Sequence, residues 1–252
     1  MYPVRIPRHA CSPRDRARAG DLWRLVQEAT ILHSADVGWP PSRYRTVGTG
    51  FVVRELTGIH LREAEYGEAL VATTRVVESR RDILMRRETG IADVLAGSVE
   101  WVHVGPDGAP ARASRELVEA FPVEPGGPPV TLPEWEPVSP IPLPDLEVRP
   151  WWTEMDPMGH VNHPRYVDWA DEAISCWLAT LGRDPLGLVP VAEKVRFRAG
   201  AKAGDVITVG GALVGRREGA AVIHLKMRRG EELVCDVVAI RAHLTGPDAW
   251  PT

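Results

Sequence analysis

The residues best suited to chemistry stand together in one segment, residues 154–166 (EMDPMGHVNHPRY). Asp156 is followed four residues later by His160 and six residues later by Asn162. A carboxylate can act as a general base on water or attack an electrophilic carbon itself. A nearby imidazole or amide can orient the water or hydrogen-bond the carboxylate. The segment therefore predicts a catalytic site with Asp156 as the reacting group and His160 and Asn162 as its partners.

A helix is expected directly after this segment. In residues 166–182 (YVDWADEAISCWLATLG) the apolar side chains recur with the 3.6-residue spacing of one helical face. The amides of Gly159 to Val161 would then lie at the positive end of the helix, where they can stabilise an oxyanion. Gly159 also lets the backbone approach a substrate closely. We expect Met158, Gly159 and Val161 to form the substrate-binding side of the site.

Each of the three catalytic candidates also has a structural interpretation. Asp156 can be a turn residue before Pro157, and His160 can be a structural hydrogen-bonding residue. Asn162, the only Asn in the chain, can be an N-cap of the helix.

The two halves of the chain resemble each other. Residues 22–38 (LWRLVQEATILHSADVG) align without a gap on residues 166–182, so that Glu28-Ala29 falls on Glu172-Ala173. Strand-like runs separated by turns follow each helix, with hairpin turns expected at residues 88–90 and 229–230. Each half is therefore predicted to be one long helix followed by an antiparallel meander, which indicates a duplication.

The duplication provides an internal comparison for the candidate site. At the offset of the helices, Asp156, His160 and Asn162 correspond to Ser12, Arg16 and Arg18. The first half therefore lacks the carboxylate and the imidazole, and we expect a single active site in the second half. Glu172 has a counterpart, Glu28, in the first half, which favours a shared structural role.

A proline-rich stretch separates the halves. We predict an N-terminal unit at 1–121, an extended linker at 122–149 and a C-terminal unit with the active-site loop at 150–252, because dense prolines prevent helices and central strands.

The segment D-x-M-G-H-V-N-x-x-x-Y, followed by W-x-x-E-A, resembles the active-site loop and central helix of the hotdog-fold thioesterases. The duplicated arrangement is similar to the acyl-ACP thioesterase family. The resemblance implies an α+β fold of two tandem hotdog units, each a long helix wrapped by an antiparallel sheet, paired as an intrachain pseudo-dimer. It also implies hydrolysis of fatty acyl-ACP or acyl-CoA without a cofactor, and a first half that helps to enclose the acyl chain.

The sequence departs from the plant-type acyl-ACP thioesterases at two places. Met158 stands where those enzymes carry Asn, and Gly200-Ala201 stands where they carry a Glu-Cys pair. The choice between an acyl carrier protein and coenzyme A therefore stays open. Arginine pairs at 80–81, 86–87, 216–217 and 228–229 would suit either anionic carrier if they lie at the tunnel mouth, and are otherwise a solvated surface.

Two other functions compete with thioester hydrolysis. A hotdog dehydratase or hydratase acting on hydroxyacyl or enoyl thioesters would also use an Asp–His pair, although such enzymes typically show Asp-x-Asn-Pro-x-His. A non-catalytic module would bind acyl thioesters without turnover.

Composition excludes several other classes. The 30 Lys and Arg nearly balance 34 Asp and Glu in the 252 residues, which argues against a nucleic-acid partner. No apolar run approaches the ~18 residues of a membrane span, and the N-terminus lacks a signal-peptide stretch, so we expect no membrane partner and a cytoplasmic location. We expect no metal site, Cys176 packed in the core and His163 facing solvent. A homodimer of the double hotdog stays open.

Overall fold

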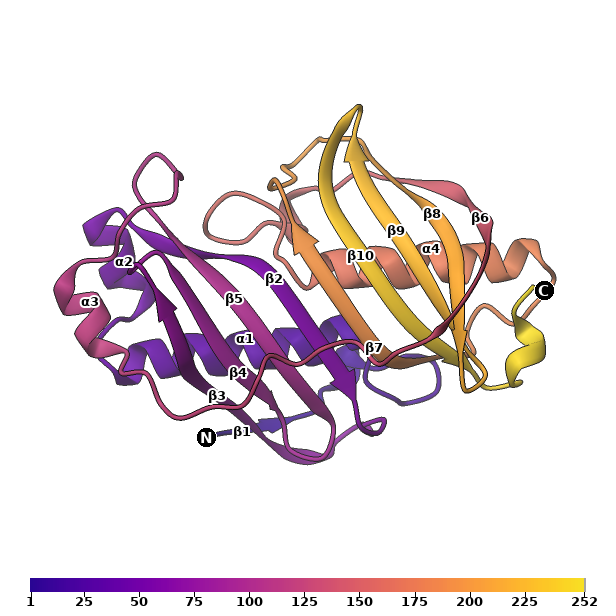
Figure 1. Cartoon of the computed structure of the whole chain (residues 1–252), viewed down its shortest axis with the longest axis horizontal. Helices are drawn as coiled ribbons and strands as arrows, with labels where there is room; N and C mark the ends of the chain where they lie inside the picture. Colours follow the sequence, from indigo (N-terminus) through magenta and orange to yellow (C-terminus); the bar gives the residue numbers. More distant parts are fainter. Residues whose placement is uncertain (252) are drawn as a thin grey trace.

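The computed structural model describes residues 1–251. Its strands form one antiparallel sheet in the order β1-β3-β4-β5-β2-β7-β10-β9-β8-β6. The two long helices, α1 (Ala19–Asp36) and α4 (Arg165–Thr180), lie on the same face of this sheet, one behind each half (Figure 1). Each half is thus a helix wrapped by an antiparallel sheet, and the predicted α+β fold of two tandem hotdog units is confirmed.

The strands follow the same order in both halves, with one strand before the long helix and four after it. The N-terminal half has β1 (Tyr2–Arg5), the 3-10 helix η1 (Arg8–Ala10), α1, α2 (Pro41–Val47), β2 (Gly50–His60), β3 (Ala69–Arg80), β4 (Leu84–Ile91), β5 (Leu95–Val104) and α3 (Arg115–Ala120). The C-terminal half has β6 (Glu136–Val148), the 3-10 helix η2 (Trp152–Glu154), α4, β7 (Leu188–Phe197), β8 (Ile207–Arg217), β9 (Ala220–Arg229), β10 (Glu232–His243) and the 3-10 helix η3 (Pro247–Ala249).

The end of the proline-rich segment is a strand at the edge of the sheet. β6 pairs with β8 alone, and its register shifts between Pro137 and Ile141 and between Leu143 and Leu146. An edge strand tolerates prolines because one side of it needs no partner for its N–H groups. β6 is the counterpart of β1, which pairs with β3 at the opposite edge. The segment 122–149 therefore contributes to the second sheet as well as connecting the halves, and our division at 121 and 150 stays a prediction.

One of the two predicted hairpin turns is wrong. Residues 88–90 lie inside β4, and the turns on either side of β4 instead use Arg81, Asp82 and Asp93, all with positive φ. Gly90 fits the strand because its partner strand passes close by: a Cβ at this position would lie 2.2 Å from the Leu95 carbonyl oxygen. The turn expected at 229–230 does connect β9 to β10, with Gly230 at φ +56°.

The halves are joined at the β2–β7 pair, where a buried polar cluster crosses the boundary. Glu193 on β7 is fully buried and accepts hydrogen bonds from Trp23 Nε1 at 2.7 Å and Arg241 Nη1 at 2.9 Å. Its Oε1 also lies 2.8 Å from His60 Nε2. Burial alone would raise the pKa of Glu193, but His60 and Arg241 hold that pKa at about 2. The ionised carboxylate therefore ties α1 and β2 of one half to β7 and β10 of the other.

Candidate active site

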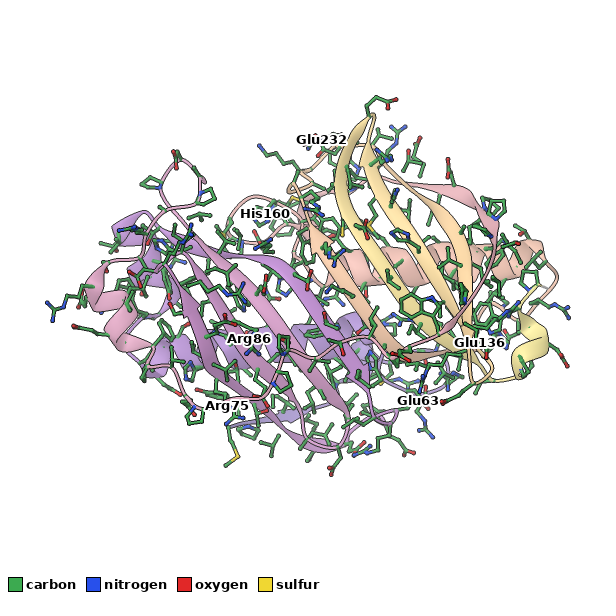
Figure 2. The ribbon with its side chains drawn as sticks, viewed as in Figure 1. Glu63, Arg75, Arg86, Glu136, His160 and Glu232 are labelled. Atoms are coloured by element: carbon green, nitrogen blue, oxygen red, sulfur yellow. The ribbon has the colours of Figure 1, made fainter. Side chains whose placement is uncertain are left out.

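The predicted catalytic segment forms a compact loop between η2 and α4. The loop is closed by an isolated β-bridge between Met155 and Val161. The Asp156 amide donates to the His160 carbonyl at 2.8 Å, and the Gly159 amide donates to the Asp156 carbonyl at 3.0 Å. Gly159 has φ +80°, a conformation that other residues rarely adopt. This turn brings Asp156 and His160 together. His160 lies at the junction of the two halves, where it is labelled in Figure 2.

Asp156 and His160 form a pair. His160 Nδ1 lies 3.3 Å from Asp156 Oδ2, and Asp156 Oδ1 accepts the Met158 amide at 2.8 Å. The hydrogen bond with Asp156 raises the pKa of His160, against the burial that lowers it. The carboxylate thus has one oxygen fixed by backbone and the other beside an imidazole that readily carries a proton.

Two of the three amides predicted as oxyanion donors, those of Gly159 and Val161, are already occupied. Gly159 N–H donates within the loop, and Val161 N–H donates to the Ala201 carbonyl at 2.8 Å. Neither is free for a substrate oxygen, because each satisfies the loop fold itself. Among the hydrogen bonds of residues 1–251, the amides of His160 and His163 donate to no partner. The His160 amide belongs to the predicted set, and the His163 amide lies two residues before Arg165, the first residue of α4.

Asn162 connects the loop to the other half of the molecule. Its Oδ1 accepts a hydrogen bond from Gln27 Nε2 on α1 at 2.9 Å. These are the only Asn and the only Gln of the chain. The N-cap of α4 is Pro164, and no side chain caps the helix, so the structure does not show the capping role considered for Asn162. Sequence reasoning missed Gln27, for which its rarity was the one available signal.

His163 was expected to face solvent, and this is wrong. Its ring packs edge-on against Trp101 at 5.8 Å and Phe197 at 6.1 Å between centroids. Burial lowers the pKa of His163 to about 3, so the ring is neutral at physiological pH.

A cavity of about 760 Å³ lies between the halves and reaches the loop. Asp156, Met158, His160, Val161 and His163 line it from the C-terminal half; Gly159 and Asn162 are not among its lining residues. The N-terminal half lines most of the rest, from α1, α2, β2, β4 and β5. Its lining is mainly apolar, including Ile31, Trp39, Phe51, Val53, Met85, Trp101, Val102 and Val104. Such a cavity has the size and character of a site for a small, largely apolar ligand.

Close contacts fix the side chains of Met158 and His160 in the loop. Met158 lies against Gly50 of β2, where a Cβ would approach the Met158 methyl group to 3.4 Å. A Cβ on Gly200 would lie 3.1 to 3.3 Å from three atoms of His160. Gly200, where plant-type enzymes carry Glu, therefore gives His160 its room. Ala201 beside it holds the loop, because its carbonyl accepts the Val161 amide at 2.8 Å. The Ala201 amide donates to the hydroxyl of Tyr166 on α4 at 2.9 Å.

The first half contains a backbone copy of the loop, at the positions that the helix offset assigns to it. Cys11 and Ala17 form the same isolated bridge, and the Ser12 amide donates to the Arg16 carbonyl at 2.8 Å. Asp15, at the counterpart of Gly159, has φ +57°. The chemistry differs: the copy carries Ser12 and Arg16 where the second loop carries Asp156 and His160.

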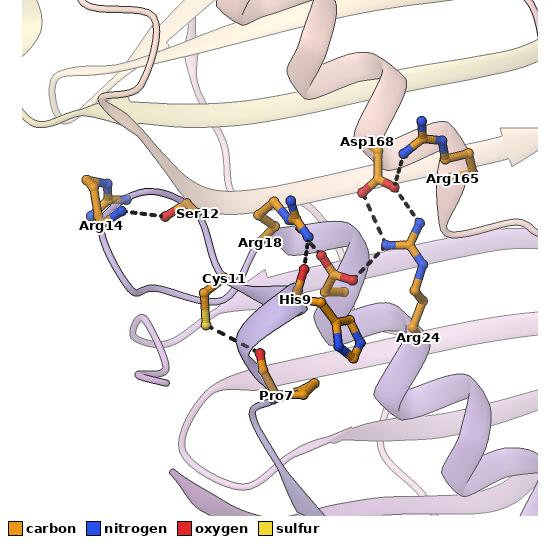
Figure 3. Close-up of polar contacts among 10 residues, drawn as sticks. Pro7, His9, Cys11, Ser12, Arg14, Arg18, Arg24, Arg165 and Asp168 are labelled. Atoms are coloured by element: carbon orange, nitrogen blue, oxygen red, sulfur yellow. Dashed lines mark hydrogen bonds and ion pairs between the residues drawn. The ribbon is translucent and has the colours of Figure 1, made fainter. Parts of the chain in front are cut away.

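Ion pairs fill the surroundings of this copy (Figure 3). A cavity of about 410 Å³ adjoins it. Arg24 pairs with Asp168 of α4 and, at 3.0 Å, with Asp21, while Arg18 pairs with Asp21 at 2.7 Å. The first loop therefore faces paired charges, whereas the second faces a mainly apolar cavity.

Several other side chains differ from expectation. Cys176 is exposed, so its predicted place in the core is wrong: it lies on the outer side of α4. Glu172 is exposed, as is Glu28 at the corresponding position of α1. Of the predicted arginine pairs, only Arg87 lines the larger cavity, and it is buried.

Two features are absent from residues 1–251. No helix there is long and apolar enough to cross a membrane. No group of three or more His, Cys, Asp or Glu side chains in that range could hold a metal ion.

Comparison with known proteins agrees with this architecture. Residues 150–245 match the family model of the thioesterase-like superfamily. The chain superposes on a putative oleoyl thioesterase from Lactobacillus plantarum with a TM-score of 0.81 and 20% identity, covering 96% of this chain and 95% of that chain. For an acyl-ACP thioesterase from Bacteroides thetaiotaomicron the TM-score is 0.73 and the identity 16%, and the superposition covers 95% of this chain and 96% of that chain.

The 12:0-ACP thioesterase from Umbellularia californica gives a TM-score of 0.74 and 15% identity, covering 96% of this chain and 93% of that chain. No curated protein sequence matches significantly. The expected resemblance is thus confirmed: residues 150–245 match the model of the thioesterase-like superfamily, and the whole chain has the double hotdog fold of these structures.

Proposed function

We propose that the protein hydrolyses fatty acyl thioesters, carried by an acyl carrier protein or by coenzyme A, to the free acid and the thiol. The observation that supports this most is the Asp156–His160 pair at the N-terminus of α4, on the wall of a mainly apolar cavity. The cavity suits an acyl chain, and the pair suits attack on a thioester carbonyl. The thioesterases with the same fold support the same reaction class.

The pair can perform each proton transfer that hydrolysis requires. Asp156 removes a proton from water, and the water oxygen attacks the thioester carbon. The amides of His160 and His163 are the free donors for the resulting oxyanion. The C–S bond then breaks, and His160 gives its proton to the departing thiolate. Asn162, held by Gln27, positions the start of α4.

Direct attack by Asp156, with an acyl-enzyme anhydride as intermediate, is the alternative route. A single turnover in ¹⁸O-labelled water can reveal this route. The label enters the Asp156 carboxylate only when hydrolysis of an anhydride has occurred there.

Three exposed arginines line the cavity and suit an anionic carrier. They are Arg45, Arg54 and Arg198, and of these only Arg54 has a carboxylate within 4.0 Å among residues 1–251, Glu100 at 3.7 Å. The phosphates of coenzyme A and the acidic surface of a carrier protein would both be attracted to such a rim. These residues replace the predicted pairs at 80–81, 216–217 and 228–229, which do not line the cavity.

The test is thiol release from acyl-CoA and acyl-ACP substrates of C4 to C18, with wild type, Asp156→Asn and Ser12→Ala in parallel. Ser12 occupies the same place in the first loop, so its variant is the matched control. We expect Asp156→Asn to lower kcat at least ~10²-fold and Ser12→Ala to leave it unchanged.

The same assay identifies the competing functions. Hydration of enoyl thioesters without thiol release would indicate a hydratase. Tight acyl-thioester binding without turnover, unaffected by Asp156→Asn, would indicate a binding module.

A further inference from the structure

Arg87 is a buried cation in the wall of the cavity. It lies on β4, and 3% of its surface is exposed. β5 and β2 separate β4 from the C-terminal half. Met85 of β4 pairs with Trp101 of β5, and the Trp101 ring contacts His163 beside the loop. Arg87 lies two residues beyond Met85 on β4. The strand dimensions place its Cα about 8 Å beyond that of Trp101. Arg87 is therefore at the part of the cavity far from Asp156.

The guanidinium of Arg87 has no anionic partner. It donates to His33 Nδ1 at 3.1 Å and stacks over the Phe121 ring at 4.9 Å. No carboxylate within residues 1–251 lies within 4.0 Å of it, in contrast to the buried Arg241, which pairs with Asp171 and Glu193. Burial lowers the pKa of Arg87 to about 10, which leaves it charged at neutral pH. An unpaired buried charge is strongly unfavourable unless a ligand compensates it.

Further hydrogen-bond donors without partners line the same cavity. The Tyr44 hydroxyl and the Nε1 atoms of Trp39 and Trp101 are buried and have no partner among the described residues. Asp156 is the one carboxylate among the described lining residues. Buried polar groups are normally satisfied, so three unsatisfied donors beside an unpaired cation indicate a ligand that supplies acceptors. A methyl-terminated acyl chain would supply none.

We propose that the preferred acyl group carries a carboxylate at its far end, and that Arg87, Tyr44 and Trp39 bind this carboxylate. The proposal rests on the proposed thioesterase function, because it takes the acyl chain to run from Asp156 into this cavity. It defines the substrate class as ω-carboxyacyl thioesters. Arg87 is then a specificity-determining residue that contacts the end of the substrate remote from the reaction.

The experiment compares ω-carboxyacyl and methyl-terminated acyl thioesters of matched length, C6 to C12, on both carriers. The variants are Arg87→Met and Arg86→Met. Arg86 is the matched control: it is an equally buried arginine of β4 that faces away from the cavity and pairs with Glu78 at 3.0 Å (labelled in Figure 2). Melting temperatures confirm that each variant is folded.

We expect wild type to favour the ω-carboxyacyl substrate in kcat/KM at its best length. Arg87→Met should reduce that preference by about 10- to 100-fold, the worth of a hydrogen bond to a charged group, and Arg86→Met should keep it. A wild-type preference for methyl-terminated chains, or an Arg87→Met variant with unaltered preference, would overturn the proposal and leave the thioesterase function intact. A preference for ω-hydroxyacyl over ω-carboxyacyl substrates would also overturn it.

A binding measurement separates this proposal from the proposed function. Calorimetry with pantetheine thioethers, which cannot be hydrolysed, compares ω-carboxyalkyl and alkyl chains directly. Tighter binding of the ω-carboxyalkyl probe, lost in Arg87→Met, supports the subsite even if no thioester is turned over. Equal binding of the two probes contradicts it.

Discussion

The buried carboxylate of Glu193 should be the most sensitive single position for stability. In Glu193→Gln the negative charge is lost, and the guanidinium of Arg241, 1% exposed, loses the carboxylate that lies 2.9 Å from its Nη1. Removing one partner of a buried ion pair typically costs about 3–5 kcal/mol. Domains of ordinary stability have about 5–15 kcal/mol in total, so this change removes a large part of it. Urea unfolding followed by circular dichroism measures the difference.

Glu55 provides the matched control at the same boundary between the halves. It also pairs with two cations across the β2–β7 seam, Lys194 at 2.7 Å and Arg196 at 2.8 Å, but 25% of its side chain is exposed. Glu55→Gln should therefore cost about 1 kcal/mol or less. If the two variants had the same free energy of unfolding, burial would not determine how much these ion pairs stabilise the fold. Our explanation of how the β2–β7 boundary is stabilised would then be wrong.

Acid titration gives a second measurement of the same group. The pKa of Glu193 is depressed to about 2, below its unfolded value of about 4.3. Its contribution to stability is therefore complete above about pH 4.3 and is lost as the pH falls toward 2. Glu193→Gln should flatten the pH dependence of the unfolding free energy in this window, and an unchanged slope would contradict the assignment.

The remaining predictions concern His160. Gly200→Ala should displace the His160 ring by a few tenths of an ångström and lower kcat about tenfold, with little change in stability. Gly127→Ala is the control: a Cβ there meets nothing within 4 Å, so kcat and stability should both stay unchanged. Because Asp156 raises the pKa of His160, the pair should stabilise the fold fully below the unfolded pKa of about 6.5 and less as the pH rises through the folded pKa. NMR titration should show the His160 pKa falling in Asp156→Asn, and an unshifted titration would disprove the pairing.

Sequence patterns predicted the parts of the molecule that local physics controls. The spacing of the apolar residues predicted the helices α1 and α4. The constant offset between the halves predicted which residues of the first half correspond to Asp156, His160 and Asn162. Contacts between distant segments were not accessible in this way. The Gln27–Asn162 hydrogen bond depends on how α1 meets the second loop, and the inward direction of His163 depends on Trp101 and Phe197. The occupied amides of Gly159 and Val161 likewise depend on which carbonyls the folded loop places beside them.

The two loops show which property of the fold is shared and which is specific to one half. The backbones close with the same bridge and the same 2.8 Å hydrogen bond, although Ser12 replaces Asp156 and Arg16 replaces His160. The loop conformation therefore does not require the Asp–His pair. What differs is the adjoining space: paired arginines and carboxylates beside the first loop, and a cavity whose described lining has one carboxylate beside the second. Because the pair is dispensable for the loop fold, its location at the cavity that suits an acyl chain is best explained by chemistry carried out there.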